Sequence, residues 1–102
     1  MSNLHSPSER LQGDLADVRR KRLLFQCWHR GTQEGDLILG MFAETSLTSL
    51  HGAQIDQFEA LLDCTDAELL DWVLGDRAPP PQHDHDVTRQ LRDFWARRDR
   101  PL

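Results

Sequence analysis

Apolar residues recur at three- and four-residue steps through most of this chain, which is the spacing of an amphipathic α-helix. Strand-favouring runs of valine, isoleucine and threonine are missing, and the chain contains no tyrosine. We therefore expect an all-α protein, a compact five-helix bundle with short connections. The predicted helices cover about residues 15–29, 34–44, 53–63, 66–74 and 86–98.

Each predicted helix carries apolar residues that share one face, and this face would turn toward a core. In the first two helices the expected core residues are Leu15, Val18, Leu24, Phe25 and Trp28, then Leu37, Ile38, Met41 and Phe42. In the last three they are Ile55, Phe58, Leu61 and Leu62, then Leu69, Leu70, Val73 and Leu74, then Val87, Leu91, Phe94 and Trp95. The basic run at residues 19–22 is typical of a solvated face.

Local signals set the ends of these helices. Asp14 is a good N-cap for the first helix, because Gly13 interrupts any helix that begins nearer the N-terminus. Thr65 and Glu68 have the spacing of a capping box that opens the fourth helix. The run Pro79–Pro81 forbids a helix and predicts a stiff extended connector.

A chain of 102 residues and 11.8 kDa has room for one domain with a thin core. We expect residues 1–14 to be a disordered or frayed lead and residues 15–100 to form a single helical domain. The lead resembles neither a signal peptide nor an organellar presequence, so the bacterial cytoplasm is the expected compartment, ahead of the mitochondrial matrix. No stretch approaches the roughly 18 consecutive apolar residues of a transmembrane helix, so no membrane insertion is expected.

The net charge of −5 hides a segregation along the chain. Residues 1–30 carry six Lys or Arg against three Asp or Glu, residues 31–86 carry one against twelve, and residues 87–102 carry five against two. The ends are basic and the middle is acidic. Two interpretations stand: this layout orients a partner on approach, or the basic and acidic helices neutralise one another within the bundle.

No group of residues predicts an enzyme. Cys27 and Cys64 lie far apart without metal-type spacing, which indicates reduced, partly buried thiols. From His83 to Asp86, His83 and His85 alternate with aspartates in a pattern that could bind metal, but an N-cap by one of the aspartates is simpler. Glycine-rich phosphate loops and dinucleotide fingerprints are missing. We expect no catalytic residue, no metal site and no stably held cofactor.

The candidate site is the corner where the first helix meets the second, and we call residues 28–36 the elbow. Gly31 suits the left-handed position that follows a helix C-terminus. Arg30 would then lie beside unpaired carbonyls, and Glu34 would fall in the first turn of the next helix, where the helix dipoles favour both charges. Simple helix capping explains this spacing, so the spacing alone does not name a function.

The motifs at the elbow and beyond it resemble the SdhE family, the small FAD assembly factors of succinate dehydrogenase. The resemblance rests on Arg-Gly-x-x-Glu at residues 30–34 and on Asp-Leu-Ile-Leu-Gly-x-Phe at residues 36–42. It continues through Phe58–Leu62, Asp66, Leu69, Asp71–Gly75 and Pro79–Pro81, and spans about residues 17–97. The chain departs from the family at Thr32 and Gly35, where methionine and a larger residue are usual; Gly35 costs about 1 kcal/mol of helix propensity relative to alanine.

The resemblance implies a helical chaperone, monomeric when free, that binds the flavoprotein subunit of succinate dehydrogenase and, by extension, of fumarate reductase. It would promote covalent attachment of FAD to a histidine of that subunit, so FAD would act on the partner. The implied docking residues are Arg30, Gly31 and Glu34, with Asp36 as a weaker candidate and Trp28 and His29 as flanking contacts.

Nucleic-acid binding, or a regulatory role, by a small helical module is the alternative. The first and last helices are basic, and short helices joined by a glycine corner invite comparison with a helix-turn-helix. The acidic middle argues against this alternative, because it would repel a phosphate backbone. We therefore expect no nucleic-acid partner.

Overall fold

Five α-helices with short connections make up the computed structural model, which describes residues 7–98 and their side chains from Leu15 onward. The helices are α1 (Pro7–Cys27), α2 (Gln33–Ser46), α3 (Ala53–Leu61), α4 (Asp66–Val73) and α5 (Asp86–Arg98). Two 3-10 turns, η1 (Leu47–Ser49) and η2 (Pro81–His83), follow α2 and precede α5. No strand occurs within residues 7–98, so the all-α prediction is confirmed.

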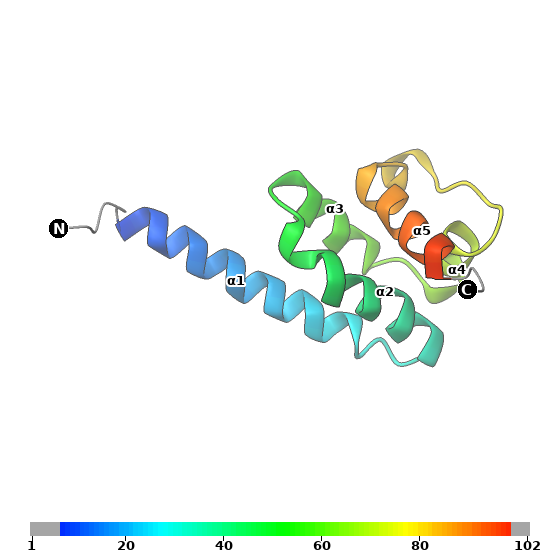
Figure 1. Cartoon of the computed structure of the whole chain (residues 1–102), viewed down its shortest axis with the longest axis horizontal. Helices are drawn as coiled ribbons and strands as arrows, with labels where there is room; N and C mark the ends of the chain where they lie inside the picture. Colours follow the sequence, from blue (N-terminus) through cyan, green and yellow to red (C-terminus); the bar gives the residue numbers. More distant parts are fainter. Residues whose placement is uncertain (1–6, 99–102) are drawn as a thin grey trace.

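Helix α1 lies along one side of the molecule, and its N-terminal half extends beyond the other helices (Figure 1). The chain turns back after α1, so that α2 packs against the C-terminal half of α1. Helix α2 also contacts α4 and α5, and α3 contacts α5. The elbow therefore lies at the end of α1 that is packed against the rest of the bundle.

Helix α1 begins earlier than predicted. We expected a start at residue 15 behind an Asp14 cap, whereas the helix runs from Pro7 through Gly13 without a break. Proline suits a first helical turn, and a single glycine costs only about 1 kcal/mol, which the neighbouring turns tolerate. Residues 1–6 lie outside the described residues, and the division of the chain at residue 14 stays a prediction.

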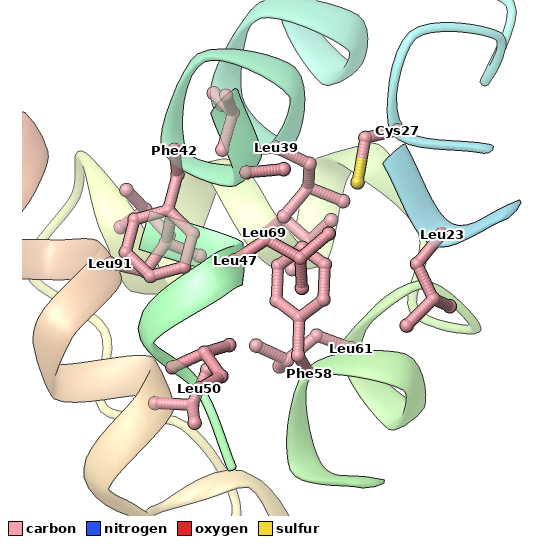
Figure 2. Packing of buried hydrophobic residues seen from close by; sticks show 14 of the residues in the cluster. Leu23, Cys27, Leu39, Phe42, Leu47, Leu50, Phe58, Leu61, Leu69 and Leu91 are labelled. Atoms are coloured by element: carbon pink, nitrogen blue, oxygen red, sulfur yellow. The ribbon is translucent and has the colours of Figure 1, made fainter. Parts of the chain in front are cut away.

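The core is one cluster of apolar side chains from all five helices (Figure 2). Phe42 of α2 and Phe58 of α3 are almost fully buried, and their ring centroids lie 5.8 Å apart. The expected core residues of α3 and α5 that are confirmed as buried are Ile55, Phe58, Leu61, Val87 and Leu91. Leu62, Phe94 and Trp95 pack against the cluster while partly exposed.

The expected core face of α1 is wrong. Leu15, Val18 and Phe25 are 60%, 61% and 62% exposed, whereas Leu23 and Cys27 are fully buried. The two sets lie on opposite sides of the helix. Helix α2 folds back across the side that holds Leu23 and Cys27, and this fixes which stripe becomes core. Leu24 packs partly against the core, as expected, and Trp28 is half-buried.

The core faces of α2 and α4 are rotated slightly from the predicted ones. The buried side chains of α2 are Ile38, Leu39, Phe42 and Ala43, so two of the four expected residues are confirmed. Leu37 is 38% exposed, and Met41 is half-buried. In α4 the buried residues are Leu69, Trp72 and Val73, while Leu74 is 50% exposed and Leu70 is half-buried.

The predicted capping box of α4 is confirmed. Thr65 Oγ1 accepts a hydrogen bond from the Glu68 N–H at 3.1 Å, and the Glu68 carboxylate accepts one from the Thr65 N–H at 2.9 Å. The aspartate N-cap predicted for α5 is not found, because among the described residues Asp84 and Asp86 accept hydrogen bonds only from side chains. The Thr88 N–H donates instead to His85 Nδ1 at 3.3 Å, so an imidazole takes the place that we predicted for an aspartate. The proline run is extended up to Pro80 and then forms η2, rather than staying extended throughout.

Both cysteines are free and buried, as expected. Burial raises the pKa of the Cys27 thiol to about 12 and also raises the pKa of Cys64. Such thiols stay protonated at neutral pH and are poor nucleophiles.

Candidate functional site

The elbow is a tight turn built around one glycine. Helix α1 ends at Cys27, Gly31 has a φ of 107°, and Thr32 is the N-cap of α2. A positive φ strains residues with a side chain, so glycine is the residue that fits here. The Thr32 hydroxyl accepts a hydrogen bond from the Gly35 N–H at 3.1 Å, and Glu34 lies in the first turn of α2. The positive φ of Gly31 and the place of Glu34 in the first turn of α2 are as predicted, whereas α1 ends at Cys27 and not at the predicted residue 29.

Arg30 points into the molecule rather than toward a partner. Its Nη1 donates to the Leu62 carbonyl at 2.8 Å, and its Nη2 donates to the Cys64 carbonyl at 2.6 Å. Its Nε donates to Asp66 Oδ1 at 2.7 Å, and the side chain is only 11% exposed. Carbonyls at a helix end have no partner within the helix, and a guanidinium supplies several donors in one plane. Arg30 thus caps the end of α3 and ties it to the elbow.

The expectation that Arg30 is an exposed anchor for a partner therefore needs correction. We predicted that it would lie beside the last carbonyls of its own helix, but it bonds carbonyls more than thirty residues further along the chain. Sequence spacing reveals near neighbours in a helix, and it does not reveal which distant helix end will lie within reach.

Asp66 completes this ion pair from the start of α4. Besides Arg30 Nε, its carboxylate accepts a hydrogen bond from the Thr32 hydroxyl. The Thr32 hydrogen bond, with Arg30 adding a further one and its positive charge, holds the pKa of Asp66 below its usual value. The carboxylate thus joins the α4 N-terminus to the N-cap of α2.

Gly35 makes room for that carboxylate. A Cβ atom built on Gly35 would lie 2.4 Å from Asp66 Oδ1, which is closer than real Cβ contacts allow. The missing side chain, a departure from the family pattern, therefore has a structural reason in this chain. It lets α2 approach α4 closely enough for Thr32 and Arg30 to share one carboxylate.

Asp36 is also used inside the elbow. Its Oδ1 accepts a hydrogen bond from the Arg30 backbone N–H at 2.8 Å, and the residue is half-buried. This bond closes the turn between the two helices. Asp36 holds the turn in shape through Oδ1, and its Oδ2 has no hydrogen-bond partner among residues 15–98.

Gly31 and Glu34 lie on the outer side of the elbow. Both are exposed, and a Cβ atom on Gly31 would have no atom within 4 Å. Among the residues that the structure describes, the Glu34 carboxylate has no hydrogen-bond or ion-pair partner. These two residues form the part of the motif that the fold leaves accessible.

Trp28 and His29 differ in their accessibility. The Trp28 ring lies against Gly40, where a Cβ atom would be 2.5 Å from the ring, and its Nε1 donates to Glu44 at 3.0 Å. His29 is exposed and stacks on Phe25, with ring centroids 3.8 Å apart. Trp28 therefore fastens α1 to α2, and His29 remains on the surface.

Comparison with known proteins identifies the family. Residues 21–95 match the sequence profile of a family described as flavinator of succinate dehydrogenase. The chain belongs to this family. The match covers the whole elbow and Asp66, and it leaves the first two thirds of α1 outside.

Named relatives come from bacteria and from mitochondria. The chain is 38% identical over 65 residues to the FAD assembly factor SdhE of Acetobacter pasteurianus, covering 64% of this chain and 59% of that protein. It is 27% identical over 95 residues to the mitochondrial succinate dehydrogenase assembly factor 2 of Danio rerio, covering 91% of this chain and 60% of that protein. It is 31% identical over 94 residues to the mitochondrial succinate dehydrogenase assembly factor 2 of Meyerozyma guilliermondii, covering 88% of this chain and 70% of that protein. The chain thus spans about three fifths of the first two relatives' length.

The structure adds three residues that sequence reasoning missed: Asp66 as the partner of Arg30, Thr32 as a second hydrogen-bond donor to Asp66, and Phe25 as the support of His29. Asp66 was noticed only as part of the family resemblance. The acidic residue in the first turn of α4 was a usable signal, because it could have been paired with the one arginine at the elbow.

An open hollow of about 340 Å³ lies beside the elbow and is lined by Gln26, Arg30, Leu62 and Asp63. Within residues 7–98, no helix has both the length and the apolar content to cross a membrane.

Proposed function

We propose that this chain is an assembly factor that binds the flavoprotein subunit of succinate dehydrogenase and promotes covalent attachment of FAD to a histidine of that subunit. The same activity toward fumarate reductase is a natural extension. Membership of a family described as flavinator of succinate dehydrogenase supports this proposal. The structural observation that carries it is an accessible Gly31 and Glu34 on an elbow that is braced from behind by Arg30 and Asp66.

In this proposal the elbow docks onto the immature flavoprotein near its FAD pocket. It holds the flavoprotein in a conformation in which the accepting histidine is aligned with the flavin. Alignment of reacting groups lowers a barrier by several kcal/mol without any donated catalytic group. A rigid elbow suits this task, because an interface that is already ordered loses less conformational entropy on binding.

The residues of the elbow have different roles in this proposal. Glu34 bonds a cationic side chain or an N–H group of the flavoprotein, and Gly31 allows its backbone to come close. His29 adds contact area. Arg30 and Asp36 act as positioning residues, because their bonds shape the turn that presents the other three. Trp28 has the same supporting role between α1 and α2.

The chemistry takes place on the partner. We propose that this chain supplies no catalytic group and holds no FAD stably, is a monomer when free, and works in the bacterial cytoplasm rather than the mitochondrial matrix. FAD is bound by the flavoprotein. The exposed Glu34 and the buried, protonated thiols of Cys27 and Cys64 offer no activated nucleophile to a flavin.

Nucleic-acid binding is less well supported, because two basic residues of α1, Arg19 and Arg20, are engaged within the bundle. Arg19 bonds Glu59 and Asp56 of α3, with Nη2 to Oδ1 of Asp56 at 2.8 Å. Arg20 donates to the Leu50 carbonyl at 2.9 Å. The basic first helix and the acidic middle of the chain therefore neutralise one another in part, and fewer cations remain for phosphates.

The test is co-expression of the flavoprotein subunit with this chain or with Glu34→Ala. Acid-stable flavin fluorescence of the subunit in a denaturing gel reports covalent flavinylation. We expect a clear loss with Glu34→Ala and a larger one with Gly31→Arg, which strains the turn and places a long side chain in the docking surface. Asp71→Ala, an exposed acid on α4, is the matched control and should leave flavinylation unchanged. Unchanged flavinylation with Glu34→Ala would remove Glu34 from the mechanism.

A further inference from the structure

Helix α1 carries an apolar stripe that nothing in the bundle covers. Leu15, Val18 and Phe25 are 60%, 61% and 62% exposed, although they are large apolar residues. Their spacing of three and seven residues places them on one face, together with Arg22 and His29. That face is opposite the side on which Leu23 and Cys27 are buried. We call these five residues, Leu15, Val18, Arg22, Phe25 and His29, the outer stripe.

The outer stripe ends at the elbow. Phe25 stacks on His29, and His29 is followed directly by Arg30 and Gly31. At a rise of about 1.5 Å per residue, the stripe runs for about 20 Å along α1 from the elbow. Because His29 belongs to both the stripe and the elbow, a protein that docks on Gly31 would also meet the end of the stripe.

The charges along the stripe are positive and only weakly neutralised. Arg22 is 55% exposed, and its closest acid is Glu59 at 3.5 Å. Arg19 binds Oε1 of Glu59 through both Nε and Nη2, while Arg22 contacts Oε2, so two arginines share this one carboxylate. Lys21 is exposed beside the stripe, without an acidic partner among residues 15–98. A complementary surface would be apolar with carboxylates at its edge.

We propose that the outer stripe is a second docking surface for the same flavoprotein, and that it contacts an apolar surface of that protein bordered by acidic residues. This proposal rests on the proposed function. The elbow then gives the contact its position near the FAD pocket, and the stripe enlarges the buried apolar area. Exposed apolar side chains in a row are typical of such contact surfaces.

A second copy of the chain fits the stripe less well. In a parallel pair related by a two-fold axis Arg22 would face Arg22, and in an antiparallel pair with Val18 opposite Phe25 it would face Lys21. Both arrangements bring like charges together. Three apolar side chains also fall short of the roughly 800 Å² that each partner buries in a stable interface, so the stripe needs a neighbouring contact such as the elbow.

The test measures the affinity of the full chain for the isolated, unflavinylated flavoprotein subunit by titration calorimetry. In Val18→Gln/Phe25→Gln both residues become polar, uncharged and helix-compatible. We expect its dissociation constant to rise about tenfold or more, as is usual when central apolar contacts are removed. Leu74→Gln, at a half-exposed leucine at the end of α4, is the matched control and should bind like the wild type. Circular dichroism and the urea midpoint show that each variant is folded.

Each outcome separates the two proposals. Binding of the double variant within twofold of the wild type, while Glu34→Ala binds more weakly, would overturn the outer stripe and leave the proposed function standing. No binding by the folded wild type would overturn both. Sedimentation of the wild type as a dimer that the double variant returns to a monomer would make the stripe a self-association surface and overturn the proposal. In support, Arg22→Ala should make binding less sensitive to salt than it is for the wild type.

Discussion

The inner and outer sides of the elbow use charged residues in opposite ways. On the inner side, Arg30 and Asp66 are 11% and 21% exposed and are joined to each other, to two carbonyls and to Thr32. On the outer side, Glu34 is exposed and has no partner within the described part of the chain. A single short motif thus contains residues that build the elbow and residues that the elbow presents.

This difference separates stability from function. Loss of an inner residue breaks bonds within the monomer, so it should lower the free energy of unfolding. Loss of the Glu34 carboxylate breaks no hydrogen bond or ion pair among the described residues, so it should act mainly when a partner is bound. Variants on the two sides can therefore be compared by the same two measurements, unfolding and binding.

The largest stability effect is expected for Arg30→Ala. The substitution leaves the Asp66 carboxylate without its cation and the Leu62 and Cys64 carbonyls without donors. Breaking a buried ion pair from one side costs about 3 kcal/mol or more, and we expect about 3 kcal/mol of unfolding free energy here. Urea unfolding followed by circular dichroism measures it, with Arg77→Ala, an exposed arginine, as the control. A loss below about 0.5 kcal/mol would contradict an inner, structural Arg30.

Acid should weaken the same ion pair in a defined direction. The pKa of Asp66 is lowered from its ordinary value of 3.8 in the folded protein, so its stabilising contribution is complete above that pH. The contribution is lost as the pH falls through the lower, folded-state pKa. The stability gap between the wild type and Asp66→Asn should therefore shrink in urea titrations carried out progressively below pH 3.8. A gap that stays constant in this range would show that the stabilisation by Asp66 does not depend on the ionisation of its carboxylate.

Gly35→Ala should have a smaller effect, whose sign depends on Asp66. In an otherwise wild-type chain the new Cβ displaces the Asp66 carboxylate, which lies 2.4 Å from the position of that Cβ. We expect the free energy of unfolding to fall by about 1 kcal/mol, even though alanine has the higher helix propensity. In an Asp66→Ala background the clash disappears, so Gly35→Ala should stabilise by about 0.5 to 1 kcal/mol. A double-mutant cycle of urea midpoints measures this reversal. Equal effects in both backgrounds would show that Gly35 does not make room for Asp66.

The smallest effect on stability is expected for Glu34→Ala. The residue is exposed in the first turn of α2, where an acid interacts with the helix dipole by about 0.3 to 0.5 kcal/mol. Thermal and urea unfolding should therefore differ little from the wild type. A destabilisation above about 1 kcal/mol would place Glu34 among the structural residues and weaken its role in docking.

Much of the elbow could be predicted from the sequence because its signals are local. The positive φ of Gly31 and, outside the elbow, the Thr65–Glu68 capping box depend on a few neighbouring residues, and both were found as predicted, although α1 ends at Cys27 and not at residue 29. The destination of the Arg30 side chain depends on where α3 ends in space. Pairing across more than thirty residues is a property of the packed fold, which local patterns do not contain.

The core faces show the same limit. Helix α1 has apolar residues on two sides, and we predicted the core from the one that contains Leu15, Val18 and Phe25, because periodicity does not decide which side faces the core. The return of α2 across Leu23 and Cys27 decides it, and Leu15, Val18 and Phe25 are left outside. Ile55, Phe58 and Leu61 of α3 were predicted correctly, because that short helix has a single stripe.

The most direct test of the account compares Glu34→Ala with the wild type for binding to the unflavinylated flavoprotein subunit, under conditions where unfolding shows both chains to be fully folded. We predict a dissociation constant at least about tenfold higher for Glu34→Ala, with a melting temperature that differs little from that of the wild type. Equal affinity of the two chains would contradict the central claim that the outer side of the elbow is the docking surface.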